Sequence, residues 1–304
     1  MDLPEETGGL RAAGYPTNNK RPRRRKPPGL NLFGLYSGRH PCGVCPSANG
    51  NRGLHMIDFT MRVAGQVVAV SAMYESSRAY CSAYLCEDTP AYAICITPED
   101  IAFEREKSAR EAALEGLPVR EYGDAYLETI AIQRKLAEAL FAHDTLLFHG
   151  SVVAVDGAAY LFTAKSGTGK STHTRLWREV FGERAVMIND DKPFLHVGEA
   201  GVTVFGSPWN GKHRLGSNIS APLRAICILQ RGAENRIRRI TPKEAVSMLV
   251  QQSNRPQNRR LMLQYMRLLD RLAARVVFYN LECNMEPEAA RIAYAAMAGK
   301  EENA

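Results

Sequence analysis

The sequence lacks the long apolar runs that membrane proteins carry. No window of about 18 or more uncharged apolar residues occurs in its 304 residues, so no transmembrane helix is expected. No apolar segment follows the basic residues near the N-terminus, which argues against a secretory signal. The composition, with 45% hydrophobic and 23% charged residues, is close to the soluble globular average and excludes a collagen-like, wholly disordered or membrane-embedded chain. We therefore expect a cytoplasmic protein with no membrane partner.

Excess positive charge is scarce beyond the first 55 residues. The formal net charge is +7. Residues 1–55 hold nine Lys and Arg against three Asp and Glu, so six of the seven excess charges lie in this segment. The remainder is nearly neutral, and nucleic-acid binding by the folded part is not expected. The basic run over residues 21–26 either contacts nucleic acid or another acidic surface or is a solvated tail, and we favour the solvated tail.

A full set of metal-binding cysteines is also absent. Cys42 and Cys45 form a lone CxxC pair with no second pair, so a zinc site there would lack two ligands. The other five cysteines are scattered, most of them among apolar neighbours, which is typical of reduced thiols in a cytosolic core. They are Cys81, Cys86, Cys95, Cys227 and Cys283.

The chain divides into three regions by composition. Residues 1–55 contain nine Gly and seven Pro with few branched aliphatic residues, so they cannot bury enough apolar surface to offset the entropy of ordering. We predict a disordered basic tail there, and one hypothesis places the biological start at Met56 or Met61. Residues 56–145 are predicted to form a small α+β region, and residues 146–304 a catalytic α/β domain.

Apolar and β-branched patterns predict the elements after residue 56. Strands are expected over residues 61–71, 91–97, 146–155, 158–164, 186–188, 202–205, 223–229 and 276–281. Asp156 and Gly157 form a turn that joins two of these strands into a hairpin. Helices are expected over residues 98–115, 172–180, 261–272 and 286–297, and from Asp124 and Thr241 onward.

The strongest chemical signal is a phosphate-binding loop over residues 164–171, whose sequence AKSGTGKS fits the Walker A pattern. Gly167 and Gly169 permit positive φ, so successive N–H groups turn inward as an anion nest at a helix N-terminus. Lys170 supplies a point charge for the β and γ oxygens, and the Ser171 hydroxyl can bind Mg²⁺. A chance glycine-rich turn is the alternative, but a strand precedes the loop and a helix follows. The predicted nucleotide-binding residues are Ser166, Gly167, Thr168, Gly169, Lys170, Ser171 and Thr172.

An acidic pair follows the short strand over residues 186–188. A carboxylate at the end of a buried strand can reach the Mg²⁺ of a bound nucleotide. Asp190 and Asp191 are adjacent and point to different sides, so one can meet the metal while the other faces the acceptor. A simple turn is the alternative for an isolated Asp-Asp pair, but the phosphate-binding loop upstream favours a functional role.

Two further features are open to both a functional and a structural interpretation. His149, on the strand before the loop, either orients a carboxylate or shuttles a proton, or is a hydrogen-bonded core histidine. Residues 206–216 combine three basic side chains and one aromatic between glycines. Such a segment either grips phosphate or an anionic substrate, or is a plain exposed loop.

These residues, in this order, resemble the C-terminal catalytic domain of bacterial HPr kinase/phosphorylase and, more remotely, the nucleotide site of phosphoenolpyruvate carboxykinase. The resemblance covers residues 146–230. It implies an α/β fold, with a carboxykinase-like phosphate-loop core and a mixed β-sheet flanked by helices. It also implies that Lys170 holds the nucleotide phosphates, that Ser171 and Asp191 lie at the metal, and that Asp190 is the candidate base with His149 beside it. The sequence leaves open which of the two aspartates accepts the proton and which binds the metal.

The resemblance has departures that narrow the expected activity. HPr kinases have Glu directly after the loop Ser, whereas this chain has Thr172, and the segment that grips HPr is not evident. We therefore expect an ATP- and Mg²⁺-dependent kinase that phosphorylates a hydroxyl, a Ser of a protein or peptide other than HPr. A nucleotide-binding regulatory protein and a small carboxykinase-like lyase are the alternatives, and a homo-oligomer is left open.

Overall fold

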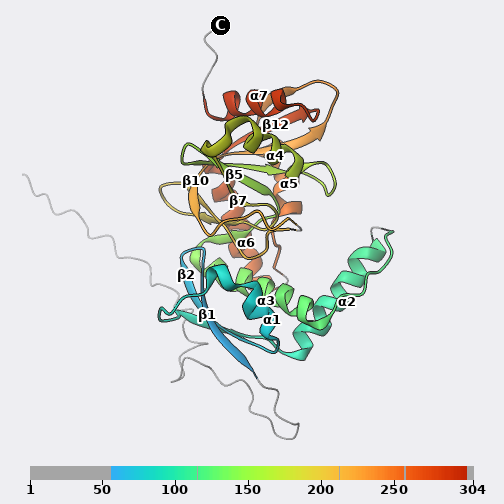
Figure 1. The fold of residues 1–304 in the computed structure, drawn as a ribbon, viewed down its shortest axis with the longest axis vertical. Coiled ribbons are helices and arrows are strands. Elements are labelled where there is room, and N and C mark those ends of the chain that lie inside the picture. Colours follow the sequence, from blue (N-terminus) through green and yellow to red (C-terminus); the bar gives the residue numbers. More distant parts are fainter. Residues whose placement is uncertain (1–55, 115, 212, 257, 300–304) are drawn as a thin grey trace, which may run out of the picture. The chain divides into compact units, whose positions relative to one another are not determined.

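The computed structural model describes residues 56–299 except 115, 212 and 257, and these residues form two β-sheets with helices beside them (Figure 1). The architecture is mixed α/β, which confirms the predicted class in its broad form. The predicted disordered tail, the basic run and the CxxC pair lie outside the described residues. Within the described ranges, no helix is both long and apolar enough to cross a bilayer.

The first sheet is built from β1 (Ile57–Val63), β2 (Gln66–Ala72) and β3 (Tyr92–Cys95), in that order. The prediction of one strand over residues 61–71 is wrong, because Ala64 (φ 50°) and Gly65 (φ 76°) form a two-residue turn between antiparallel strands. An Ala-Gly pair is a weaker turn signal than Asn-Gly, so the break was not visible in the apolar pattern.

Three helices pack in this first region: α1 (Glu75–Tyr80), α2 (Pro98–Leu114) and α3 (Asp124–Leu140). The last two agree with the predicted helices, whereas α1 was not predicted. Glu128 is fully buried on α3 and accepts hydrogen bonds from the backbone N–H groups of Met73 and Tyr74 and from the Ser77 hydroxyl. The Glu128 carboxylate thus binds the two backbone N–H groups that directly precede α1 and a hydroxyl in its first turn, so α3 fixes the start of α1.

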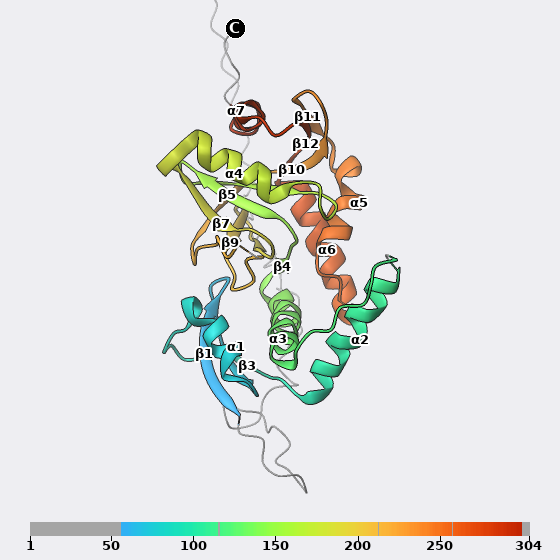
Figure 2. The same cartoon turned by 45° about the vertical axis from the view of Figure 1, so that its right-hand side comes forward.

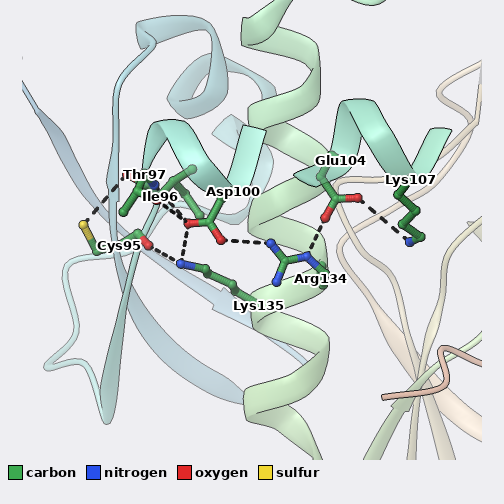
Figure 3. Close-up of polar contacts among 8 residues, drawn as sticks. All are labelled: Cys95, Ile96, Thr97, Asp100, Glu104, Lys107, Arg134 and Lys135. Atoms are coloured by element: carbon green, nitrogen blue, oxygen red, sulfur yellow. Dashed lines mark hydrogen bonds and ion pairs between the residues drawn. The ribbon is translucent and has the colours of Figure 1, made fainter. Parts of the chain in front are cut away.

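A charged network joins α2 to α3 (Figure 3). The Arg134 guanidinium contacts Glu104 through Nε and donates to Asp100 Oδ1 at 2.9 Å through its terminal nitrogen. Lys135 pairs with the same Asp100 and donates to the backbone oxygen of Cys95 at 2.8 Å. The Glu104 side chain is only 2% exposed. Its charge therefore depends on Arg134 for compensation.

We expect Arg134→Met to destabilise the fold by about 3 kcal/mol, because it leaves the buried Glu104 charge without its partner. Chemical denaturation monitored by circular dichroism measures the change. Lys107→Met is the matched control, since the Lys107 ammonium lies 3.9 Å from Glu104 and is itself 36% exposed. The control is expected to cost less than about 1 kcal/mol. Equal losses in the two variants would contradict a special role for the Arg134 contact.

The second sheet has nine strands and a mixed pattern. Seven of them follow the order β4-β8-β9-β10-β6-β5-β7, and β12 pairs with both β10 and β11. The long strand β10 is antiparallel to β9 over its first residues and parallel to β6 and β12 over its later ones, so the sheet curls along β10. The strands are β4 (Thr145–Leu147), β5 (Ser151–Val155), β6 (Ala158–Thr163), β7 (Ala185–Asn189), β8 (Phe194–Val197), β9 (Val202–Phe205), β10 (Ser220–Arg231), β11 (Arg236–Ile240) and β12 (Val277–Cys283).

Helices cover both faces of the parallel part of this sheet (Figure 2). Successive residues of β5, β6 and β10 alternate between two hydrophobic clusters, as the pleat requires. One cluster includes α4 (Lys170–Phe181) and α7 (Pro287–Met297), and the other includes α5 (Pro242–Gln252) and α6 (Arg259–Arg275). Thr241 is the N-cap residue of α5, and Glu244 completes a capping box with it.

Most elements after residue 146 agree with their predicted positions, with three exceptions. Strands β8 and β11 were not predicted, and the expected strand over residues 146–155 is broken into β4 and β5. Among the scattered cysteines, Cys81, Cys86, Cys227 and Cys283 are free, as expected. Cys95 is disulfide-bonded, so the expectation of a reduced thiol is wrong there.

His173 is a buried histidine on the inner face of α4. Its Nε2 accepts a hydrogen bond from the indole N–H of Trp177 at 3.0 Å, so the ring proton lies on Nδ1. The ring also packs edge-on against Phe162, with centroids 4.6 Å apart. Burial lowers the pKa of His173 from 6.5 to about 4. The folded chain therefore keeps this histidine neutral at pH values where the unfolded chain protonates it.

This shift predicts a loss of stability in mild acid. Between pH 6.5 and about 4 the unfolded state binds more protons at His173 than the folded state, so stability falls as the pH falls. We expect His173 to contribute a loss of about 2 kcal/mol between pH 7 and pH 5. His173→Gln retains an acceptor for Trp177 but cannot titrate, so urea unfolding of this variant should depend less on pH. An unchanged pH dependence would refute the assignment.

Candidate active site

The predicted phosphate-binding loop joins β6 to α4. Gly167 and Gly169 have φ values of 75° and 122°, so both occupy backbone conformations that favour glycine. The Thr168 hydroxyl donates to the backbone oxygen of Lys165 at 2.9 Å and closes the loop internally. Ser166, Gly167 and Ser171 are exposed, whereas Thr168, Gly169, Lys170 and Thr172 are partly buried. The strand, loop and helix therefore occur in the order that the sequence predicts.

Helix α4 begins without a capping side chain. Its N-cap residue is Gly169, and no described side chain accepts from the first N–H groups of the helix. The first turn of a helix leaves such donors free and carries partial positive charge. An anion with several oxygen acceptors matches this arrangement.

Two basic side chains hold the loop. The Lys170 ammonium donates to the backbone oxygen of Ala164 at 3.3 Å, and burial lowers its pKa while the charge of Asp191 raises it. Arg231, at the end of β10, donates through Nε to the Thr168 backbone oxygen at 3.3 Å and through a terminal nitrogen to the Gly167 oxygen. Arg231 thus donates hydrogen bonds to two backbone carbonyl oxygens of the loop from the end of β10. The sequence analysis did not identify it, because its contact depends on the pairing of β10 with β6.

His149 lies in the break between β4 and β5, not within a strand as expected. The backbone changes partners there, because His149 N–H donates to the Gln252 oxygen at 2.6 Å and Gly150 N–H to the Asp191 oxygen at 3.0 Å. A Cβ at Gly150 would lie 3.0 Å from the Phe162 oxygen, so only glycine fits without a shift. The break brings His149 Nε2 to 3.3 Å from Asp191 Oδ1.

His149 is neutral in this environment. Burial lowers its pKa to about 3, and the nearby charges of Lys192 and Lys170 act in the same direction. The imidazole can therefore orient a carboxylate or a ligand by hydrogen bonding. It does not supply a positive charge at physiological pH.

Asp190 is 6% exposed and is held on the side of α4. The Ser151 hydroxyl, on β5, donates to Asp190 Oδ1 at 2.7 Å and lies 2.8 Å from the Thr174 hydroxyl. Because the Ser151 hydrogen is donated to Asp190, the Thr174 hydroxyl donates its single hydrogen to Ser151. The backbone oxygens of Lys170 and Ser171 both lie 3.3 Å from the Thr174 oxygen. A chain of hydroxyls thus connects the carboxylate to the first turn of α4.

Asp191 is more accessible, with 33% of its side chain exposed. Burial raises its pKa, while the charges of Lys192 and Lys170 lower it. The acidic pair therefore contains one enclosed carboxylate and one open carboxylate. Both act electrostatically on Lys170.

The segment over residues 206–216 braces the acidic pair. Ser207 and Asn189 hydrogen-bond to each other, and the Asn189 amide oxygen accepts from the backbone N–H groups of Asp191 and Lys192 at 2.8 and 2.7 Å. The indole of Trp209 donates to the Thr129 oxygen on α3 at 3.0 Å. The first half of the segment, residues 206–210, is buried and so is not a plain exposed loop, whereas His213 and Arg214 are exposed.

A cavity of about 170 Å³ lies between α2 and α3. Its lining includes Lys107, Glu111, Tyr122 and Tyr126. The two tyrosine rings lie 5.1 Å apart, and the charge of Asp191 contributes to the raised pKa of Tyr126, after burial and Tyr122. One residue of this lining, Tyr126, is therefore within electrostatic range of Asp191.

In the structure, His149 contacts Asp191, and Lys170 lies within electrostatic range of Asp190, Asp191 and His149. The structure adds Ser151, Thr174, Lys192 and Arg231, which sequence reasoning missed. Of these four residues, only Lys192 could have been identified from the sequence, because it directly follows the acidic pair.

Comparison with known proteins identifies a family. The family model described as "SynChlorMet cassette protein ScmC" matches residues 125–293, more than half of the chain, from α3 to α7. The chain belongs to the ScmC family. The family match spans the phosphate-binding loop, the acidic pair and most of the helices around them. No curated protein matches the chain.

Among solved structures, the chain is similar to the Hpr(Ser) kinase/phosphatase from Coxiella burnetii. The match has 9% sequence identity and covers 51% of this chain and 95% of that chain, with a TM-score of 0.29. A superposition this weak supports no conclusion about function.

Proposed function

We propose that this ScmC-family chain is an ATP- and Mg²⁺-dependent phosphotransferase that acts on a hydroxyl group, a serine of a protein or peptide. One observation carries the proposal: the uncapped start of α4, with Lys170 beside it, faces an acidic pair that is connected to the same helix turn through Ser151 and Thr174. Phosphate binding and proton acceptance are thus combined in one place. Phosphoryl transfer requires little more than positioning and charge stabilisation.

The residues fit a Mg·nucleotide. The loop N–H groups and Lys170 would hold the phosphates, and Ser171 and Asp191 would lie at the metal. Among the described residues, no group of three or more His, Cys, Asp or Glu could hold a metal ion by itself. Mg²⁺ commonly binds through one or two carboxylates together with substrate phosphates, so this small donor set is appropriate. When bound, Mg²⁺ neutralises charge on the phosphate oxygens.

The two carboxylates of the acidic pair would have different roles, one in proton acceptance and one at the metal. Among the described residues, only Ser151 hydrogen-bonds to the Asp190 carboxylate, and it uses Oδ1. Oδ2 is left to accept the proton of the acceptor hydroxyl. His149, neutral and 3.3 Å from Asp191, orients that second carboxylate toward the metal side.

The acceptor would approach through the cavity between α2 and α3. Its tyrosine pair offers apolar faces to a peptide side chain, and Lys107 and Glu111 offer both signs of charge. A peptide carries apolar and charged side chains beside its serine hydroxyl, and these would match the lining of the cavity. This matches a peptide or protein acceptor better than a small polar metabolite.

The proposal is tested by incubating the full chain with Mg²⁺, γ-labelled ATP and an arrayed library of serine-containing peptides. We expect label on a subset of peptides and none with a Lys170→Ala variant. Binding of Mg·ATP without transfer to any acceptor would favour a nucleotide-binding regulatory protein. Absence of Mg·ATP binding in calorimetry would refute nucleotide use altogether.

A further inference from the structure

Arg231, the last residue of β10, lies beside the phosphate-binding loop because of the register of the sheet. Strands β10 and β6 are parallel, and Ile228 lies opposite Thr163, the last residue of β6. Strand β10 continues past this point, paired with β12, until Arg231 lies opposite Cys283, while the chain that leaves β6 turns into the loop. The sheet therefore fixes the Arg231 backbone next to the loop.

The Arg231 guanidinium holds two successive peptide groups of the loop. Its Nε donates to the Thr168 carbonyl oxygen at 3.3 Å, and a terminal nitrogen donates to the Gly167 carbonyl oxygen. The donors of a guanidinium lie in one rigid plane, so a single orientation of the side chain makes both contacts. A lysine ammonium is a point charge on a flexible stem and has no such fork.

These two peptide groups are also the ones that the loop glycines leave most free to rotate. Gly167 and Gly169 flank Thr168 and have φ values of 75° and 122°, in the region where glycine is least restricted. In a planar trans peptide, the C=O and N–H bonds point in opposite directions, so holding a carbonyl oxygen also fixes the direction of the next N–H. The Thr168 N–H accordingly meets the Lys165 oxygen at 3.3 Å within the loop. The Gly169 N–H is directed away from Arg231, at the uncapped start of α4.

We propose that Arg231 is a positioning residue, which sets the N–H groups of the loop for phosphate binding before the nucleotide arrives. The inference rests on the proposed function. Arg231 acts through the backbone carbonyls of Gly167 and Thr168 and not through contact with a phosphate. A loop that is already ordered loses less conformational entropy on binding, so the affinity for the nucleotide is higher.

Calorimetry with Mg·ATP tests this role. We expect Arg231→Ala to lower the affinity by about tenfold, as for the loss of exposed hydrogen bonds made by a charged group. Arg239→Ala is the matched control, because it removes an equal charge from an exposed position on β11, and it should change the affinity by less than about twofold. Arg231→Lys keeps the charge without the planar fork and should recover only part of the affinity. Wild-type affinity in Arg231→Lys would overturn the proposal.

Chemical rescue separates positioning from a general loss of packing. Methylguanidinium can enter the space left in Arg231→Ala and donate to the same two carbonyl oxygens, so its chloride salt should restore part of the Mg·ATP affinity. Methylammonium chloride at the same concentration matches the ionic strength but lacks the fork, so it should not. Rescue by both salts, or by neither, would contradict a positioning role for the guanidinium.

Amide hydrogen exchange in the nucleotide-free chain measures the order of the loop directly. The amides of residues 166–169 should exchange faster in Arg231→Ala than in the wild type, whereas those of β6 and of the later turns of α4 should be unchanged. Equal exchange of the loop amides in the two chains would show that Arg231 does not order the loop. Arg231 is exposed, so the variant should fold. If circular dichroism shows otherwise, Arg231→Gln takes its place, with the same expected direction.

The outcomes separate this inference from the proposed function. If the wild type binds Mg·ATP and Arg231→Ala binds it equally tightly, the positioning role is wrong and the nucleotide site stands. If the wild type does not bind Mg·ATP, the proposed function falls and the role of Arg231 falls with it.

Discussion

Lys170→Ala is expected to lower the affinity for Mg·ATP by about a hundredfold or more, because a lysine in this position makes charge-assisted contacts with two phosphate groups. The side chain is already partly buried beside the loop and donates to the Ala164 oxygen. Its ammonium therefore needs little reorganisation to meet a phosphate. Calorimetric titration with Mg·ATP measures the effect.

Lys243→Ala is the matched control, since it removes an equal charge from an exposed position on α5. Circular dichroism must show that both variants are folded. Lys170→Ala should also be slightly more stable than the wild type without nucleotide, because burial disfavours the charged form of this lysine. If Lys170→Ala binds Mg·ATP as tightly as the control, the loop does not hold phosphate.

The sequence predicted the local parts of this site because each depends on a short pattern. The loop motif lies between a strand and a helix, and the positive φ values of Gly167 and Gly169 agree with the reason given for those glycines. The ends of β6, β7 and β9 were predicted to within two residues for the same reason. Apolar alternation and turn residues are properties of neighbouring positions.

The sequence could not predict contacts between segments that lie far apart in the chain. His149 was placed on a continuous strand, because the apolar run over residues 146–155 gives no sign that β4 pairs with β8 while β5 pairs with β6 and β7. Ser151 and Thr174 are unremarkable in the sequence, yet together they connect Asp190 to α4. Such partners emerge only when the sheet order is known.

Asp190→Asn is expected to lower the rate of phosphoryl transfer by about a hundredfold to ten-thousandfold, the range for loss of a general base. The amide has nearly the same shape, and its oxygen still accepts a hydrogen bond from Ser151, so the connection to Thr174 is retained. It cannot take a proton at neutral pH. Single-turnover assays with an acceptor peptide from the library screen measure the rate, and calorimetry should give a Mg·ATP affinity within about threefold of the wild type.

Asp191→Asn separates the two carboxylates. Its side chain is open to solvent and lies beside His149, so its loss should weaken Mg²⁺ binding and raise the Mg²⁺ concentration needed for half-maximal rate. Excess Mg²⁺ should restore much of the rate of Asp191→Asn but none of that of Asp190→Asn. The reverse pattern would exchange the two roles. Normal transfer by Asp190→Asn would exclude it as the base and leave Asp191, with its raised pKa, as the carboxylate that accepts the proton.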